Sequence, residues 1–425
     1  MDTRFTDVML HEGTDSNWAS VREILTNLRS VYFSLAQNEK MDLRFLAYNR
    51  PDENWSRVKI IEKWDAQRLF FLDDSPPAPH VLSSMTTKNP DWNRKIYIHV
   101  YGNFTYDLRA WTDAEPFIIG KPLLLMCASE RQKKHVSSFV AEESLRVVPF
   151  PVDQNIFFYR SEIRKELRES LGVQPNDYLL VYAGRFSLQK NILPLLKEFE
   201  RWLKTDWGGK LHIALAGEFD SLSAPMLKFD YPEGLFYTDV EQFLRSLPYS
   251  CRRRIHFMGW QTHEELARLY SAGDGFISLS THMDEDFGMA PKAANFCGLP
   301  SLLSDWGGFW TDFDGGQYNS FFPIHFSEKG LLFRQDEVDQ ILHHRIIERL
   351  GEKQRKDLSQ KAVSAFGFNA IEKKIADILK EKEIPPFSGF NWRSGAFAFH
   401  FKKRKIERFD DDSVFKEFYG CYAGK

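Results

Sequence analysis

The sequence has little cysteine, no long apolar run and no excess of basic residues. Its four cysteines (Cys127, Cys251, Cys297 and Cys421) lie far apart, and none forms a C-x-x-C pair or has a histidine at metal-ligand spacing. No apolar run approaches the roughly 20 residues that a membrane-spanning helix needs, and residues 1–7 lack the pattern of a signal peptide. We therefore expect a cytoplasmic protein, soluble or peripheral to the inner face of a membrane.

The charge balance argues against a nucleic-acid partner. The chain carries 56 basic and 59 acidic residues, a formal net charge of -3, so the strongly basic footprint of a nucleic-acid binder is missing. Aromatic residues make up 15% of the chain, and most of them are expected to fill a core. A length of 425 residues is too great for one ordinary core and predicts two domains.

Short apolar or β-branched runs alternate with helical patterns along the whole chain. This alternation predicts an α/β protein with two Rossmann-like, doubly wound domains. The expected strands are Val8–Leu10, Leu43–Tyr48, Leu69–Leu72, His80–Leu82, Lys95–Tyr101, Leu123–Cys127, Arg146–Phe150, Tyr178–Ala183, Leu211–Ala216, Ile255–Met258, Gly275–Leu279, Pro300–Leu303 and Phe321–His325. An amphipathic helix is expected from Ile192 to Leu203, and Thr262-His263-Glu264-Glu265 reads as a capping box that opens another helix.

A proline-rich turn after residue 147 suggests the domain boundary. We expect an N-terminal domain over residues 1–155, a C-terminal domain over residues 156–380, and a tail over residues 381–425 that packs back on the first domain. In the tail, Phe397, Phe399 and Phe401 alternate with period 2, which predicts an extended segment. The neighbouring basic cluster could meet anionic lipid headgroups, so residues 390–408 are a candidate for membrane contact, the alternative being a solvated charge run.

Two motifs follow strands of the second half and could hold an anion. The first is Gly184-Arg185, a short loop and Lys190-Asn191, in which two cations lie on either side of a turn from strand to helix. The second is Glu285-Asp286-Phe287-Gly288-Met289, which lies between an apolar strand and a helix that ends at Gly298. The carboxyl end of a parallel strand, next to a helix N-terminus, is where α/β sheets place anionic ligands.

These motifs together resemble the donor site of retaining glycosyltransferases of the GT-B fold, in the family known as family 4 or group 1. The resemblance covers about residues 95–379 and also rests on Ser304-Asp305-Trp306-Gly307-Gly308. It implies a metal-independent transferase without a cofactor. Its donor, a UDP-sugar or a GDP-sugar, would bind the C-terminal domain, and its acceptor would bind the N-terminal domain. The acceptor, whether a glycan, a lipid-linked molecule or a small molecule, is left open.

The resemblance assigns roles to individual residues. Arg185 and Lys190 would hold the donor diphosphate, and Glu285 would hydrogen-bond the donor sugar. Gly184, Phe287, Gly288 and Met289 would line the donor site, as would Gly13 in the first domain, where it marks the remnant of a glycine-rich loop. His99, at the end of a predicted strand, would stand beside the reacting sugar, although a histidine that only caps a strand is the simpler alternative.

The sequence departs from the family at Ala293. The family has a second glutamate there, eight residues after the first, which normally holds the nucleotide ribose. Either another residue holds the ribose, or nucleotide affinity is weak, or catalysis has been lost. A non-catalytic nucleotide- or sugar-binding protein on the same fold is therefore the alternative function. Asp284 and Asp286 form an Asp-x-Asp, but a metal is not expected because the two cations already meet the diphosphate.

Overall fold

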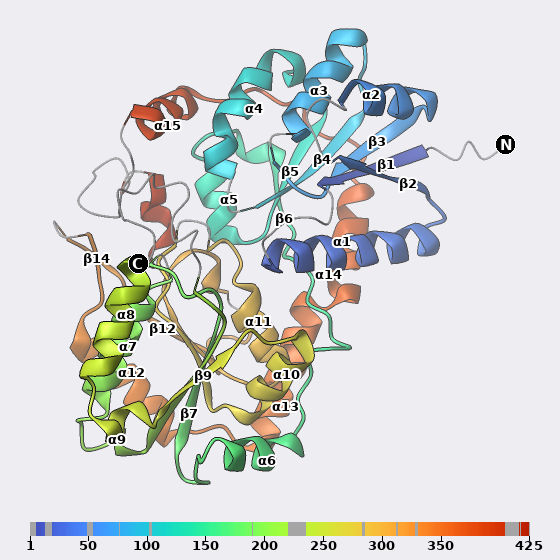
Figure 1. Cartoon of the computed structure of the whole chain (residues 1–425). Helices are drawn as coiled ribbons and strands as arrows, with labels where there is room; N and C mark the ends of the chain where they lie inside the picture. Colours follow the sequence, from blue (N-terminus) through green and yellow to red (C-terminus); the bar gives the residue numbers. More distant parts are fainter. Residues whose placement is uncertain are drawn as a thin grey trace. The chain divides into compact units, whose positions relative to one another are not determined.

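The computed structural model describes residues 6–12, 19–48, 54–75, 77–101, 104–188, 190–219, 235–282, 285–311, 313–327, 330–403, 416 and 418–424. Contacts divide the chain into two compact units. The first comprises Met1–Pro151 and Phe366–Arg404, and the second comprises Val152–Ala365 and Lys405–Lys425. Figure 1 shows both units coloured along the chain. None of the helices within the described ranges combines the length and the apolarity needed to cross a bilayer.

The first unit is built on a parallel sheet in the order β2-β1-β3-β4-β5-β6. Its strands are β1 (Thr6–Glu12), β2 (Asp42–Tyr48), β3 (Ala66–Phe71), β4 (Lys95–Val100), β5 (Leu123–Cys127) and β6 (Leu145–Val147). Its helices are α1 (Ala19–Asn38), α2 (Asn54–Lys63), α3 (Pro77–Lys88), α4 (Phe104–Ile118), α5 (Glu130–Val136), η2 (Glu142–Ser144), α14 (Phe368–Leu379) and α15 (Trp392–Lys403).

The second unit repeats this architecture with a parallel sheet in the order β12-β11-β10-β7-β8-β9. Its strands are β7 (Tyr178–Ala183), β8 (Leu211–Ala216), β9 (Ile255–Gly259), β10 (Gly275–Ser278), β11 (Ser301–Ser304) and β12 (Ser320–Phe322), with an antiparallel pair β13 (His325–Ser327) and β14 (Gly330–Leu332). Its helices are α6 (Ile163–Ser170), α7 (Ile192–Trp202), η3 (Gly208–Lys210), α8 (Leu235–Ser246), α9 (Tyr249–Arg252), α10 (His263–Ala272), α11 (Met289–Phe296), η4 (Gly307–Phe309), α12 (Gln335–Ile347), α13 (Glu352–Phe366) and η5 (Gly420–Tyr422).

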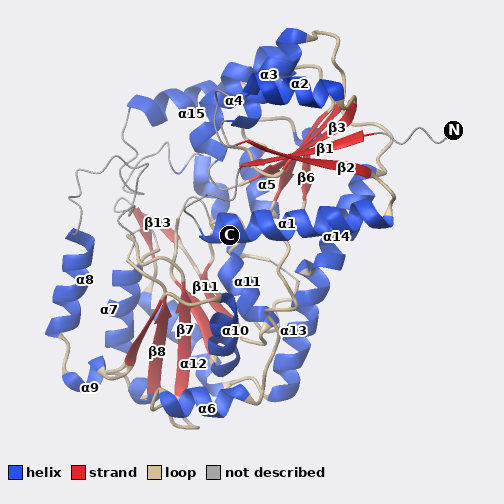
Figure 2. Cartoon of the chain, turned by 45° about the vertical axis from the view of Figure 1, so that its right-hand side comes forward, coloured by secondary structure: helices blue, strands red, loops and turns tan. Residues whose placement is uncertain are grey.

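Helices cover both faces of the second sheet, so its central strands are buried from end to end. Figure 2 shows its strands with α7 and α8 to one side and α10 and α13 to the other. Every residue of β7, β8 and β10 is buried. This explains why these strands read as continuous apolar runs rather than as alternating patterns. The predicted α/β class with two Rossmann-like sheets is confirmed.

The starts of two predicted helices also agree with the structure. The helix α7 begins at Ile192, and Pro194 lies in its first turn, where the missing N–H has no intrahelical partner to lose. At α10, the Thr262 hydroxyl accepts the Glu265 N–H at 3.2 Å and the Glu265 carboxylate accepts the Thr262 N–H at 2.8 Å. The capping box is therefore confirmed.

Two predicted strands are wrong. The run His80–Leu82 lies inside the helix α3, which begins at Pro77 and buries Ala78, Val81, Leu82 and Met85 at helical spacing. The prolines at its start do not prevent a helix, because the first turn of a helix tolerates proline. The run Phe321–His325 is divided between β12 and β13 at Pro323, which has no N–H to donate to a ladder.

The prediction of an extended segment at Phe397, Phe399 and Phe401 is also wrong, because these residues belong to α15. The Asn391 side chain accepts the Arg393 N–H at 2.9 Å, as an N-cap does. Phe397 packs edge-on against Phe139, with ring centroids 5.6 Å apart. A helix that buries Ser394 and Phe397, three residues apart, explains the segment better than the alternation of rings.

The chain returns to the first unit earlier than the proposed boundary at residue 380. The helix α14 packs against α1, and α15 packs against α4. Residues 418–424, by contrast, belong to the second unit. Of the residues in the predicted tail, α15 and the residues before it belong to the first unit, whereas residues 418–424 do not.

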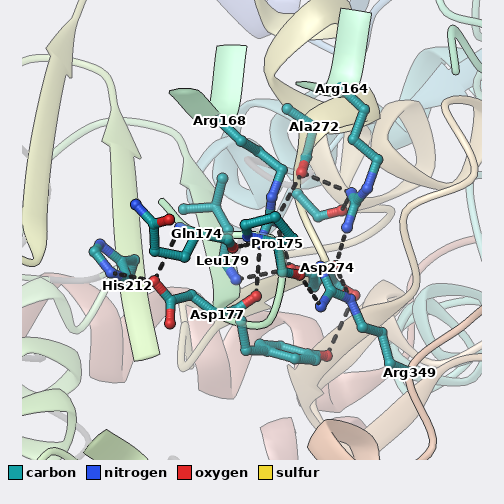
Figure 3. A network of polar contacts seen from close by, with 12 residues as sticks. Arg164, Arg168, Gln174, Pro175, Asp177, Leu179, His212, Ala272, Asp274 and Arg349 are labelled. Atoms are coloured by element: carbon teal, nitrogen blue, oxygen red, sulfur yellow. Dashed lines mark hydrogen bonds and ion pairs between the residues drawn. The ribbon is translucent and has the colours of Figure 1, made fainter. Parts of the chain in front are cut away.

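A buried ion cluster ties together the amino ends of β7 and β10 (Figure 3). Asp274, which precedes β10, accepts hydrogen bonds from four arginines: Arg164, Arg168, Arg349 and Arg355. Burial alone would raise the pKa of this carboxyl group, but the four guanidinium groups lower it to about 2. Asp274 is therefore an ionised carboxylate that holds the four arginines, and it lies at the opposite end of the sheet from the two sequence motifs.

Candidate functional site

The two motifs of the second unit meet at the carboxyl edge of its sheet. The loop with Lys190 follows β7 and the loop with Glu285 follows β10, and these strands are hydrogen-bonded neighbours. The Lys190 Nζ lies 2.6 Å from Glu285 Oε2, although the residues are 95 positions apart in the chain. The structure thus joins a cation and a carboxylate that the sequence could only place on separate turns.

Arg185 belongs to the same cluster. Its charge and that of Glu285 both act on the buried Tyr182 hydroxyl, in opposite directions. That hydroxyl donates to the Arg185 carbonyl oxygen at 2.9 Å and so fixes the turn. Gly184 has a φ of 150° in this turn, and a Cβ there would meet the Tyr182 hydroxyl at 3.0 Å. A residue with a side chain could follow this path only at a cost in strain.

Asn191 holds the second cation in place. It has left-handed backbone dihedrals at the start of α7. Its side-chain amide donates to the Leu279 carbonyl oxygen at 2.7 Å and to Thr281 Oγ1 at 3.1 Å. These contacts bind the Lys190 turn to the end of β10. In the sequence, Asn191 is marked only by its place after Lys190 in the first motif.

His282 is a site residue that sequence reasoning missed. Its side chain is buried, and burial together with the charges of Lys190 and Arg185 holds its pKa well below the ordinary value. The imidazole is therefore neutral at physiological pH. The only sequence signal was its position, three residues before Glu285.

The loop that carries Glu285 rests on a pair of glycines after β11. The Gly308 N–H donates to the Glu285 carbonyl oxygen at 2.6 Å. A Cβ at Gly308 would lie 1.7 Å from the Asp286 carbonyl oxygen, and one at Gly307 would lie 2.3 Å from that of Glu285. The Ser-Asp-x-Gly-Gly sequence is thus needed for close backbone contact with the Glu285 loop.

Gly288 is the N-cap of α11 and has a φ of 79°. A Cβ there would lie 2.6 Å from the ring of Phe309. Phe287 is buried beside it, and Met289 begins the helix. The unpaired N–H groups of the first turn of α11 and its positive dipole end therefore lie in the same loop as Glu285.

The side chains of Lys292 and Asn295, which lie near Ala293 in the chain, form hydrogen bonds with other residues. Ala293 itself is buried within α11. Lys292 Nζ donates to the Phe309 carbonyl oxygen at 3.0 Å and to Thr311 Oγ1 at 3.1 Å. Asn295 donates to Leu299, Ser301 and Asn319. Burial lowers the pKa of Lys292 to about 7, although Asp314 and Glu285 oppose the shift. Neither neighbour is placed to substitute for the glutamate.

His99 lies in the first unit and is completely buried. Its Nε2 is 3.0 Å from the Tyr32 hydroxyl, and its Nδ1 has no hydrogen-bond partner among the described residues. Burial lowers its pKa to about 3, so the ring is neutral. Its role beside a reacting sugar stays a prediction. Gly13 and Asp284 lie outside the residues that the structure describes.

A second polar edge occurs in the first unit, at the carboxyl ends of β3 and β4. Asp74 Oδ1 accepts the Tyr101 N–H at 3.2 Å, and burial raises the pKa of both side chains well above their ordinary values. Asp74 Oδ2 and the Tyr101 hydroxyl have no hydrogen-bond partner within the described ranges. Both groups can therefore donate or accept a further hydrogen bond. The sequence analysis had not singled out either residue.

The described residues include no group of three or more His, Cys, Asp or Glu side chains that could hold a metal ion. Asp286, the described half of the Asp-x-Asp, is buried and accepts a hydrogen bond from the Tyr422 hydroxyl. Asp286 is not the N-cap of α11, because Gly288 takes that position.

Residues 163–362 match the family model described as glycosyl transferases group 1. The chain thus contains a segment that is similar to group 1 glycosyltransferases. This segment contains both motifs and all of the second sheet from β7 to β12.

Two curated relatives match this chain over a part of their length. It is 29% identical over 161 residues to alpha-monoglucosyldiacylglycerol synthase of Streptococcus pneumoniae, covering 37% of this chain and 32% of that protein. It is 26% identical over 191 residues to an uncharacterized glycosyltransferase of Methanocaldococcus jannaschii, covering 43% of each. The match thus spans less than half the length of either relative.

Solved structures resemble this chain over most of its length. HepE of Anabaena, in complex with UDP and glucose, has a TM-score of 0.62 at 15% identity and covers 88% of this chain and 99% of its own. WaaG, a glycosyltransferase of lipopolysaccharide biosynthesis, has a TM-score of 0.55 at 13% identity and covers 89% and 100%. At these identities the likeness concerns the fold, which is that of GT-B glycosyltransferases.

Proposed function

We propose that this protein is a retaining glycosyltransferase that moves a sugar from a nucleoside diphosphate sugar to an acceptor. The observation that carries the proposal is the meeting of Arg185, Lys190 and Glu285 on adjacent loops of a segment that is similar to group 1 glycosyltransferases. The donor would be a UDP-sugar or a GDP-sugar. UDP is the nucleotide present in the complexes of the structural relative HepE.

The charges of this site suit a diphosphate leaving group. When the glycosyl bond breaks, the diphosphate gains negative charge, and groups already aimed at it lower the barrier most. Arg185 would chelate it through two N–H donors and Lys190 would add a point charge. A diphosphate would compete with Glu285 for Lys190 and so release the Glu285 carboxylate for the sugar hydroxyls.

The first turn of α11 would complete the diphosphate site without a metal ion. The backbone N–H groups at the start of α11 and its positive dipole end would bind a phosphate in this loop. The leaving phosphate oxygen would then take the proton of the acceptor hydroxyl on the same face of the sugar. This same-face route requires no separated pair of carboxylates of the kind that glycosidases use.

The acceptor half of the reaction would belong to the first unit. Asp74 and Tyr101 offer hydrogen-bonding groups at the carboxyl ends of its strands, where open α/β sheets bind ligands. His99 would act beside the reacting sugar only if the sugar reaches its Nδ1. The relative from Streptococcus pneumoniae, named for a glucosyldiacylglycerol product, makes a lipid acceptor the first class to test.

A second candidate function is a nucleotide- or sugar-binding protein that has lost catalysis. Ala293 favours it, because alanine cannot accept the ribose hydroxyl groups and neither Lys292 nor Asn295 is placed to do so. Hydrolysis of the donor without an acceptor separates the two functions. Slow release of free sugar is expected of a working site, whereas a pure binding protein releases none.

The first experiment is a thermal-shift measurement with UDP, GDP and ADP and with their glucose and mannose conjugates. A ligand that binds the native state alone raises the melting temperature. A shift with one nucleotide would identify the base and select the donors for an acceptor screen. If none of the ligands moves the melting temperature, the donor-site proposal is wrong.

We also propose that the protein works in the cytoplasm, at or near a membrane surface, with residues 390–408 as the contact. The test is cosedimentation with vesicles of phosphatidylglycerol, using phosphatidylcholine vesicles as the control. Binding that is selective for the anionic vesicles and falls with salt would support an electrostatic contact. Equal behaviour with both vesicle types would contradict it.

A further inference from the structure

The segment 418–424 is attached to the back of the Glu285 loop. Ala423 forms an antiparallel bridge with Trp306, and the Gly424 N–H donates to the Asp305 carbonyl oxygen at 3.1 Å. A Cβ at Gly424 would lie 1.5 Å from an oxygen of the Asp305 carboxylate, so a side chain at this position would require that carboxylate to move. The segment therefore packs directly against the turn that contains Gly307 and Gly308. This turn itself supports the Glu285 loop.

Tyr422 is the deepest side chain of this segment. It is 1% exposed, and its ring lies edge-on against Trp306 and Tyr419, with centroids 5.6 Å from each. Its hydroxyl donates to Asp286 Oδ1. Burial and the Asp286 charge raise the pKa of Tyr422 well above its ordinary value, so the phenol keeps its proton and acts as the donor.

The same region is tied to the residues on the other side of the loop. The Trp306 indole N–H donates to the His282 carbonyl oxygen at 2.8 Å, and the Glu285 N–H donates to that same oxygen at 3.1 Å. The backbone of Glu285 is thus held at both of its polar groups, because its N–H donates to His282 and its carbonyl oxygen accepts from Gly308. The next residue, Asp286, is held through its side chain by the Tyr422 hydroxyl.

We infer that Tyr422 is a positioning residue for the donor sugar, which acts through Asp286 to set the place of the Glu285 carboxylate. This inference rests on the proposed function, because Glu285 is the residue expected to bind the sugar. Tyr422 itself does not touch the donor. The hydrogen bond to Asp286 restricts the backbone that carries Glu285, and a preorganised carboxylate binds a hydroxyl better than a mobile one.

The inference predicts a specific pattern of binding. Because Glu285 contacts the sugar and the cations contact the diphosphate, loss of the Tyr422 hydroxyl should weaken binding of a nucleotide sugar more than that of its nucleotide. For Tyr422→Phe we expect a nucleotide sugar to bind about tenfold more weakly, with the nucleotide unchanged within about twofold. A contact that only stabilises the fold would change both affinities together or neither.

The experiment measures the affinities of UDP and UDP-glucose, and of GDP and GDP-mannose, for the wild-type chain and Tyr422→Phe. Tyr249→Phe is the matched control, because Tyr249 is 75% exposed and lies in α9 of the same unit. Asp286→Asn completes a double-mutant cycle. If the two residues act through one hydrogen bond, the double variant should lose no more than Tyr422→Phe alone.

Amide hydrogen exchange tests the inference without any ligand. The N–H groups of Glu285 and Gly308 are both hydrogen-bonded inside the second unit. Tyr422→Phe should speed their exchange, while Tyr249→Phe should leave it unchanged. A truncation that removes residues 418–425 should give a larger effect in the same peptides.

The outcomes separate this inference from the proposed function. If the wild-type chain binds a nucleotide sugar and Tyr422→Phe changes neither its selectivity over the nucleotide nor the exchange of these amides, the positioning role is wrong. If the wild-type chain binds no nucleotide at all, the proposed function fails, and the exchange experiment alone decides whether Tyr422 holds the loop.

Discussion

At the scale of single residues, the site depends on two cations and one carboxylate from different loops. Lys190 and Glu285 lie 2.6 Å apart, and Arg185 acts on the same buried hydroxyl as Glu285. The pair has side-chain exposures of 18% and 10%. Partial burial strengthens the interaction of these charges with each other and with a bound anion.

Removal of either cation should impair the chemistry strongly. For Lys190→Ala and for Arg185→Ala we expect turnover to fall about 100-fold, the usual effect of losing one group that stabilises a developing anion. Steady-state kinetics with the donor found by thermal shift is the measurement. Lys204→Ala is the control, since Lys204 pairs with Glu200 just beyond the other end of α7. Unchanged turnover in both site variants would rule out the diphosphate assignment.

Restoring a carboxylate at position 293 tests where the ribose lies. Ala293→Glu should tighten nucleotide binding about tenfold, because a charged acceptor would meet the ribose hydroxyls. Calorimetry gives the affinity, and Ala293→Gln, which has the same length without the charge, should recover only part of the gain. An affinity that stays flat in folded Ala293→Glu would mean that the ribose is held elsewhere.

At the scale of elements, the second unit is fixed at both ends of its sheet. The ion cluster around Asp274 joins α6, α13, Arg349 in the connection between α12 and α13, and the amino ends of β7 and β10. The Gly307-Gly308 turn supports the loop at the carboxyl end of β10. The ion cluster and the turn each lead to a separate prediction.

The turn should tolerate no side chain at Gly308. A Cβ would overlap the Asp286 backbone, so Gly308→Ala should displace the Glu285 loop and cost about 1–3 kcal/mol of unfolding free energy. Urea unfolding is the measurement. Gly209→Ala is the matched control, because no atom lies within 4 Å of its would-be Cβ. Equal stability of the two variants would contradict the close contact.

The ion cluster should be a large contributor to the stability of the second unit. Asp274→Ala leaves the buried guanidinium of Arg355 without its carboxylate, which should cost about 3–5 kcal/mol. The control is Glu169→Ala, whose pair with Lys165 is exposed and 3.8 Å long. Urea unfolding of both variants gives the difference, and a loss as small as that of the control would mean that the arginines find other partners.

At the scale of the whole molecule, the same cluster gives the unfolding free energy a defined pH dependence. The folded-state pKa of Asp274 is about 2, below its ordinary value of 3.8, so this carboxylate contributes stability above pH 3.8. That contribution should be lost as the pH falls from 3.8 toward 2. Urea unfolding at several pH values is the measurement. The Asp274→Asn variant should have a flatter profile in this window, and parallel profiles would contradict the low pKa.

Much of the fold was predictable from local patterns. Central strands such as β5, β7 and β8 have the predicted bounds, because strands buried on both faces are written as continuous apolar runs. The capping box at Thr262 is also local. The strand predicted at His80–Leu82 was wrong because a short apolar run does not distinguish a strand from a buried helix. These residues lie in α3, which packs against α2 and α4.

The candidate site was predictable only in its parts. Sequence motifs named Arg185, Lys190 and Glu285, but they could not show that Lys190 meets Glu285 or that His282 lies beside both cations. These contacts depend on the order of strands in the sheet, which puts β7 next to β10.

The sequence by itself determined the α/β class, the main strands, the cation and carboxylate motifs and the departure at Ala293. Each of these is written in neighbouring residues, where propensity, periodicity and spacing act. Tertiary structure alone decided that α15 is a helix on the first unit and that Tyr422 reaches Asp286, 136 positions earlier in the chain. Such contacts arise because folding brings distant segments together and buries their polar groups, which must then find partners.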